Sequence, residues 1–215
     1  MNGWSGRIDL PEDASTRRWH QWVREPAAGG APGVAVLGFA SDEGVRRNGG
    51  RPGAAEGPAA LRKMLSNLPL LDETPLYDAG DVDVAGGDLE GAQLKYAERL
   101  AALLDAGHLP VGLGGGHEIA FATYQGLALH LGERRPHVAI VNLDAHFDLR
   151  RQDRGSSGTP FLQAIEHAAA RGLPLDYCVL GISASANTRV LFDTAGELGV
   201  HYMRDDELGV LDLPA

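Results

Sequence analysis

Three side chains that can bind a metal occur at alternate positions in one short stretch, Asp144, His146 and Asp148. In an extended chain, residues two apart point to the same side, so two carboxylates and an imidazole would converge on one point. Oxygen and nitrogen ligands of this kind suit a divalent cation. The alternative is a solvated turn whose acids cap the next helix, and the spacing by itself does not exclude it.

The elements around this stretch support a binding site. The apolar run 137–143 is bounded by Pro136 and indicates a buried strand, and open α/β sheets bind ligands beyond the carboxyl ends of their strands. A second strand, 109–113, opens into the glycines 114–116 and His117. These glycines predict a sharp turn that brings His117 close to a ligand, although a purely structural histidine is the alternative. A dinucleotide fingerprint fits poorly, because its third glycine would fall on His117.

The rest of the chain alternates between apolar strands and amphipathic helices. Strands are predicted at 34–40, 76–80, 176–181 and 200–203, and helices at 13–25, 58–68, 89–106, 159–171 and 187–198. A further helix ends near 131, and 204–208 resembles the start of another. This alternation implies an α/β fold with a parallel sheet covered on both faces. The 215 residues fit one domain, which we expect to span 1–215.

Composition excludes several classes of protein. The net charge of −10 argues against nucleic acid or an anionic membrane as a partner. Neither lysine, Lys63 or Lys95, follows the glycines of a phosphate-binding loop. The single cysteine, Cys178, excludes an internal disulfide and predicts a buried small hydrophobic side chain. Without a signal-peptide pattern or a membrane-spanning apolar stretch, the expectation is a cytoplasmic protein.

For three polar segments, the sequence allows both a functional and a structural role. The loop after Asp148 carries Arg150, Arg151 and Arg154, which could pair with a substrate carboxylate or form a basic surface. The glycine-rich loop 41–57 could equally contact a ligand or lie on the surface. Asp81 and Asp83 are two residues apart, but the glycines that follow favour an ordinary turn over a metal site.

The segments 114–118 and 144–148 resemble the first two metal signatures of the arginase/agmatinase family, the ureohydrolases. Within that family the chain is most similar to the formimidoylglutamase group of histidine degradation, through 4–9, 18–21, 38–46, 50–54, 156–161 and 187–188. The resemblance covers essentially the whole chain. It implies a three-layer α/β/α fold with a mainly parallel sheet and a binuclear manganese site. It also implies hydrolysis of N-formimidoyl-L-glutamate to L-glutamate and formamide.

The resemblance also implies roles for individual metal ligands. His117 and Asp148 would hold one Mn²⁺, His146 the other, and Asp144 would bridge both. Two such ions lower the pKa of a water that attacks the amidine carbon. Asp148 would be catalytic as well, because it could accept a hydrogen bond from that water and orient it.

Three further residues are predicted to contact the substrate, Arg150, Ser157 and Asn187. Arg150 stands where arginases carry an asparagine, and an arginine suits a substrate with two carboxylates. Ser157 stands where many relatives carry a proton-shuttling histidine, which argues against arginase or agmatinase activity. The expected partner is therefore a small amidine substrate with carboxylates.

The family's third signature, Ser-x-Asp-x-Asp, does not occur in residues 149–215, and neither 205–206 nor 211–213 fits it. The resemblance thus predicts a chain that lacks the C-terminal strands, keeps four of six ligands and leaves two strand edges unpaired. We expect weak manganese binding and little activity from it. The alternatives are a non-catalytic truncated relative, another ureohydrolase-type hydrolase, or a hydrolase with one zinc ion. The sequence leaves the oligomeric state open, with a homo-oligomer allowed.

Overall fold

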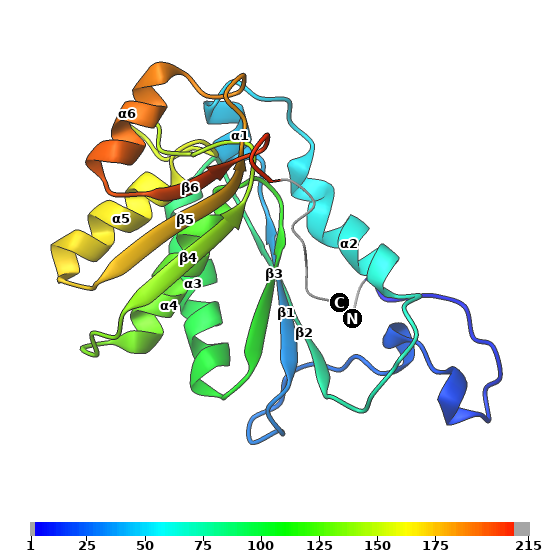
Figure 1. Ribbon diagram of the computed structural model, residues 1–215. Coiled ribbons are helices and arrows are strands. Elements are labelled where there is room, and N and C mark those ends of the chain that lie inside the picture. Colours follow the sequence, from blue (N-terminus) through cyan, green and yellow to red (C-terminus); the bar gives the residue numbers. More distant parts are fainter. Residues whose placement is uncertain (1–2, 209–215) are drawn as a thin grey trace. The chain divides into compact units, whose positions relative to one another are not determined.

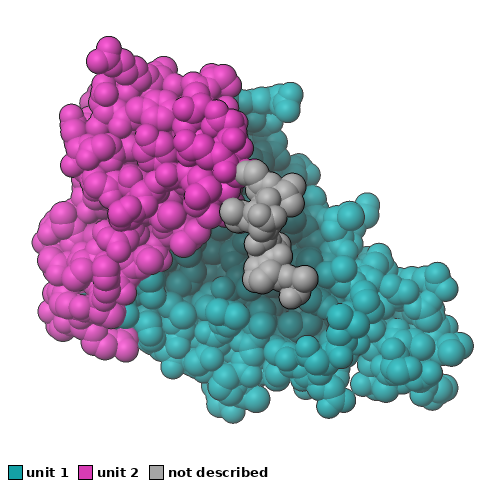
Figure 2. All heavy atoms as spheres, viewed as in Figure 1, with its two compact units in different colours: residues 1–132 teal, residues 133–215 magenta. Residues whose placement is uncertain are grey.

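The computed structural model describes residues 3–208 and divides into two compact units, residues 1–132 and 133–215 (Figure 2). Each unit has its own three-stranded parallel sheet. The predicted α/β class with parallel strands is therefore confirmed. A single domain over 1–215 stays a prediction.

Unit 1 is built on a sheet with the strand order β2-β1-β3 (Figure 1). Its strands are β1 (Val34–Ala40), β2 (Leu76–Asp83) and β3 (Leu109–Gly114). The apolar strand β1 is buried on both faces because it lies in the centre, with helices on each side. These helices are α2 (Gly57–Leu65) on one face and α3 (Leu89–Asp105) with α4 (Ile119–Leu131) on the other.

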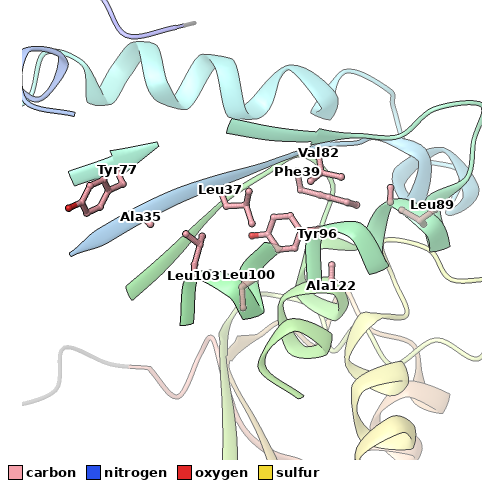
Figure 3. Close-up of a cluster of buried hydrophobic side chains, with 11 residues drawn as sticks. Ala35, Leu37, Phe39, Tyr77, Val82, Leu89, Tyr96, Leu100, Leu103 and Ala122 are labelled. Carbon is pink, nitrogen blue, oxygen red and sulfur yellow. The ribbon is translucent and has the colours of Figure 1, made fainter. Parts of the chain in front are cut away.

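The core of unit 1 lies between β1 and α3. Alternate residues of β1, Ala35, Leu37 and Phe39, face α3 and are fully buried, whereas α2 runs along the other side of the strand (Figure 3). The Tyr96 ring packs edge-on against Phe39, with ring centroids 5.4 Å apart. The period-two pattern of the strand and the amphipathic helix therefore bury one continuous apolar layer.

Unit 2 carries the sheet β4-β5-β6. Its elements are β4 (Val138–Leu143), α5 (Pro160–Arg171), β5 (Leu175–Ile182), α6 (Arg189–Glu197) and β6 (His201–Arg204). On one face of this sheet, Phe161 of α5 stacks on Tyr177 of β5, with centroids 4.4 Å apart. The register that pairs Val179 with Tyr202 places Tyr202 on the same face, where Phe192 of α6 meets it. Both helices of unit 2 thus cover one face.

On the opposite face of the unit 2 sheet, apolar side chains of β4 are exposed among the described residues. Val141 and Leu143 of β4 point to this face and are 64% and 79% exposed. Among residues 3–208, β4 pairs only with β5, and β3 pairs only with β1. The two strands that precede the predicted metal ligands therefore both lie at the edges of their sheets, as the sequence analysis predicts.

The predicted helix 13–25 is wrong. The segment forms only two 3₁₀ turns, Ala14–Thr16 and Trp19–Gln21. Its backbone instead bonds to distant chain, because Trp19 N–H donates to Leu68 O at 3.0 Å and Arg24 N–H to Leu76 O at 3.0 Å. These long-range bonds outweigh the helical pattern of the segment.

Two smaller differences concern loops. The glycine-rich loop 41–57 contains a short helix, α1 (Glu43–Arg47), and a 3₁₀ turn, Ala54–Glu56. Residues 205–207 form a turn where the sequence suggests the start of a helix. The segment 211–213, which does not fit the third signature, lies outside the described residues.

Candidate metal centre

The segment Asp144–Asp148 leaves the carboxyl end of β4 as a bend and not as an extended chain. The carboxylate Oδ1 of Asp144 accepts the backbone N–H of His146 at 3.0 Å, which closes a local turn. The Nδ1 atom of His146 lies 3.4 Å from the same oxygen. The two side chains therefore converge as predicted, but a side-chain-to-backbone turn brings them together and not the alternation of a strand.

Asp148 lies close to Asp144. One of its carboxylate oxygens lies within 4.8 Å of one from Asp144, and both side chains are half-buried. Asp148 has a φ of 50°, and it is the one non-glycine residue with a positive φ in the described part of the chain. Two close carboxylates with limited solvation repel each other, so a cation between them lowers the energy. Carboxylate and imidazole donors without a thiolate suit Mn²⁺ among the divalent ions.

Phe147, between the second and third of these residues, fixes the loop to the body of unit 2. Its ring is fully buried and packs edge-on against Phe192 and Tyr202, with both centroid distances 5.1 Å. Its backbone N–H donates to Asn187 Oδ1 at 3.1 Å, and its carbonyl accepts the Tyr177 hydroxyl at 3.1 Å. Burial raises the pKa of Tyr177 far above its usual range, so this hydroxyl keeps the proton that it donates.

Asn187 is 7% exposed and lies in the loop between β5 and α6. Its amide nitrogen donates to Ala145 O at 2.7 Å and to Ser183 O at 2.9 Å, while its oxygen accepts from Phe147. Both ends of the side chain are thus bonded to backbone. Its predicted contact with a substrate stays a prediction, and the contacts described here were not foreseen. The one available signal was an asparagine beside a glycine- and serine-rich strand end.

His117 lies in unit 1, half-buried, in the turn that follows β3. The neighbouring glycines are needed for close packing. A Cβ on Gly115 would lie 2.2 Å from Ser41 O, and a Cβ on Gly116 would lie 2.0 Å from a Glu118 oxygen. The expected turn is present, but neither glycine has a positive φ, so the glycines serve close packing, against backbone at Gly115 and against the Glu118 side chain at Gly116.

Glu118, for which the sequence predicts no role, is fully buried beside this turn. Its Oε1 accepts from the Ser41 hydroxyl and from Gly44 N–H, both at 2.8 Å. The backbone carbonyl of Glu118 accepts from Gln93 of α3 at 2.9 Å. The carboxylate thus ties the turn that carries His117 to the segment that follows β1.

The predicted substrate residues Arg150 and Ser157 lie on the loop that connects Asp148 to α5. Arg150 N–H donates to Gly158 O at 3.0 Å, which closes this loop across its base. Arg150 is exposed and is one of the residues that line a cavity of about 260 Å³, with Thr188 and Leu191. Ser157 is half-buried in the same loop.

The remaining candidates behave as ordinary structural groups. Asp81 accepts a hydrogen bond from the buried Arg62 at 2.6 Å, which supports the interpretation as a non-metal residue. Arg47 of α1 pairs with Glu43 at 2.9 Å and with Glu90 at 2.6 Å. Cys178 is half-buried on β5. Among the described residues, no helix is long and apolar enough to cross a membrane.

Comparison with known proteins gives the same assignment from sequence and from fold. The chain is 52% identical to a formimidoylglutamase of Aromatoleum aromaticum and 52% identical to one of Ralstonia nicotianae, over 99% and 98% of its length. It covers 65% and 66% of those two proteins, so it spans about two thirds of the length of the curated relatives that it matches.

Among solved structures, the formiminoglutamase of Trypanosoma cruzi with Mn²⁺ superimposes with a TM-score of 0.70 at 29% identity. That match covers 82% of this chain and 61% of the other. The formimidoylglutamase of Bacillus subtilis gives 0.78 at 21% identity, over 96% and 64%, and supports the fold alone. The sequence model of a protein family described as the Arginase family matches residues 32–214, and the chain therefore belongs to the arginase family.

Proposed function

We propose that this chain takes part in the manganese-dependent hydrolysis of N-formimidoyl-L-glutamate to L-glutamate and formamide. The observation that carries the proposal is the loop Asp144–Asp148, in which two half-buried carboxylates lie within 4.8 Å of each other at the end of a parallel strand. The 52% identity to formimidoylglutamases supports the choice of substrate.

The proposed manganese ligands are His117, Asp144, His146 and Asp148. His117 comes from the turn after β3, and the other three come from the turn after β4. In each case a strand's carboxyl end delivers the ligand, which is where parallel sheets place their sites. The imidazole and carboxylate donors fit a manganese ion, and none of the four residues is a thiolate.

When bound, manganese supplies the Lewis acidity that activates water at neutral pH. The chain's own part is to orient the reactants. Asp148, held by its backbone in a left-handed conformation, would accept a hydrogen bond from the attacking water. The water adds to the amidine carbon, and the bond from that carbon to the glutamate nitrogen breaks, so that the nitrogen leaves with a proton as the amine of L-glutamate.

Arg150 is the proposed partner of one substrate carboxylate. It is one of the residues that line the cavity between the loop after Asp148 and α6, and a guanidinium can hold a carboxylate through two parallel hydrogen bonds. Ser157 keeps its predicted place near the substrate in this proposal, whereas the polar atoms of Asn187 are bonded to backbone. A cytoplasmic location and a homo-oligomeric state remain predictions that accompany it.

Manganese binding by a matched pair of variants tests the ligand assignment. Asp144→Asn removes a proposed ligand, whereas Asp153→Asn removes an exposed carboxylate further along the same loop. Because loss of an outer-shell group already costs about 10–100-fold in metal affinity, Asp144→Asn should weaken Mn²⁺ binding at least about tenfold. The signal of free Mn²⁺ in electron paramagnetic resonance measures this, and equal affinities for both variants would contradict the assignment.

Release of L-glutamate from N-formimidoyl-L-glutamate, with and without a chelator, tests the reaction. Turnover that survives complete removal of the metal would rule out the proposed chemistry. Mn²⁺ binding without any glutamate release would favour a non-catalytic relative, and one zinc ion per chain would favour the mononuclear alternative. Tight binding of two Mn²⁺ would overturn the expectation of weak binding and leave the ligands as assigned.

A further inference from the structure

Asn187 and Tyr177 hold the residue between two proposed metal ligands from opposite sides. Phe147 separates His146 from Asp148, and each of its backbone polar groups is bonded to a side chain far along the chain. Asn187 accepts from its N–H at 3.1 Å and Tyr177 donates to its carbonyl at 3.1 Å. Asp144 closes the first turn of the loop, and groups from β5 and from the segment before α6 fix the part around Phe147.

The contacts of Asn187 extend this support to the start of the loop. Its amide nitrogen bonds to the carbonyls of Ala145 and Ser183, at 2.7 and 2.9 Å. The Ser183 backbone N–H in turn donates to Ala145 O at 3.1 Å. One buried amide thus joins two points of the loop, on either side of His146, to the strand end of β5. A side chain of this kind cannot relax without moving the loop, because all three of its bonds go to backbone.

The need for such support follows from Asp148. A non-glycine residue in the left-handed region is uncommon and persists where its surroundings determine it. The Phe147 ring, buried against Phe192 and Tyr202, helps to fix the backbone next to Asp148. The two hydrogen bonds at its backbone supply the orientation. Asn187 holds the peptide between His146 and Phe147, and Tyr177 holds the peptide that leads directly into Asp148.

We propose that Asn187, together with Tyr177, is a positioning residue that holds Asp144–Asp148 in the conformation that presents their side chains to a cation. This role rests on the proposed function for the identity of the cation and differs from the predicted contact between Asn187 and the substrate. Loss of a group that orients a metal ligand typically lowers metal affinity about 10–100-fold.

Three variants of the full chain test the proposal. Asn187→Ala removes the acceptor for Phe147 and both donors. Tyr177→Phe removes only the hydroxyl and keeps the ring that stacks on Phe161. Ser185→Ala changes an exposed side chain in the same segment as Asn187 and serves as the control.

The first measurement needs no metal. Amide hydrogen exchange by nuclear magnetic resonance should be at least about tenfold faster at Phe147 in Asn187→Ala, because its buried N–H loses its acceptor. The second is the Mn²⁺ affinity of proteins shown to be folded by circular dichroism. It should fall about 10–100-fold in Asn187→Ala and less in Tyr177→Phe, and stay within about twofold in Ser185→Ala.

The outcomes separate this inference from the proposed function. Unchanged exchange at Phe147, or unchanged Mn²⁺ affinity in a folded Asn187→Ala protein, overturns the positioning role. A raised KM at unchanged Mn²⁺ affinity also overturns it, in favour of a direct contact with substrate. If Asn187→Ala does not fold, Tyr177→Phe decides by the same two measurements. If the wild-type chain binds no Mn²⁺, the proposed function fails, and the exchange at Phe147 still decides whether Asn187 holds the loop.

Discussion

Replacing Gly115 with alanine should disrupt the turn that carries His117, whereas the same change at Gly114 should be tolerated. A Cβ at position 115 would lie 2.2 Å from Ser41 O and 2.7 Å from Phe39 O. Both are backbone atoms and cannot rotate away. At position 114 the nearest atom is Ile119 Cγ2 at 3.6 Å, an ordinary van der Waals distance.

The magnitude follows from what must move. Forcing atoms into a packed region costs about 1–3 kcal/mol. Separating the backbones also stretches two hydrogen bonds, from Gly115 N–H to Phe39 O at 2.9 Å and from Gly116 N–H to Ser41 O at 2.7 Å. Each contributes about 0.5–1.5 kcal/mol. We therefore expect Gly115→Ala to lower the free energy of unfolding by about 3 kcal/mol, and Gly114→Ala to change it by less than about 1 kcal/mol.

Urea unfolding followed by tryptophan fluorescence measures this difference selectively. All three tryptophans, at positions 4, 19 and 22, lie in unit 1, so the signal reports the unit that contains the turn. The two variants differ only in the position of one methyl group, which cancels effects on composition. If their unfolding midpoints coincide, the two backbones do not approach as closely as described and the explanation of the glycines is wrong.

Three further changes test other contacts. Arg62 is 2% exposed and donates hydrogen bonds to both carboxylate oxygens of Asp78 at 2.8 Å. Arg62→Met should therefore lower the free energy of unfolding by about 3–5 kcal/mol. The control Lys63→Met, at an exposed position, should change it little. Burial alone would raise the pKa of Asp78, but the hydrogen bonds from Arg62 outweigh this effect and lower that pKa. The stabilisation therefore exists above about pH 4 and is lost as the pH falls. Between pH 7 and pH 3, the free energy of unfolding should fall less in Arg62→Met than in the wild type. Phe147→Ala removes a fully buried ring and should cost about 3–5 kcal/mol in thermal unfolding followed by circular dichroism, and a shift no larger than that of an exposed-site variant would refute its anchoring role. Arg150→Ala should raise KM about tenfold or more at unchanged kcat, because a charged hydrogen bond contributes about 1.5–3 kcal/mol, and a lower kcat at unchanged KM would contradict substrate binding.

The sequence alone determined most of the regular elements. The strand at Val34–Ala40 and the helices that begin at Leu89 and Pro160 follow from local signals, namely an apolar run, a period of 3.6 and a proline at the first helical position. The sequence also predicted which residue types could bind a metal and their order along the chain, because ligand chemistry depends on residue identity. The conformation of the segment 13–25 could not be predicted in this way, since its hydrogen-bond partners lie about fifty residues away.

Only the tertiary structure decided how the candidate ligands are held. Asp144 and His146 meet through a turn that Asp144 itself closes, and the conformation of Asp148 depends on Asn187 and Tyr177. Gly115, before His117, is required by the close backbones of Phe39 and Ser41. The contacts at Asp148 and at Gly115 join residues from different elements, and the spacing of side chains along one segment carries no information about the atoms that another segment will bring against it.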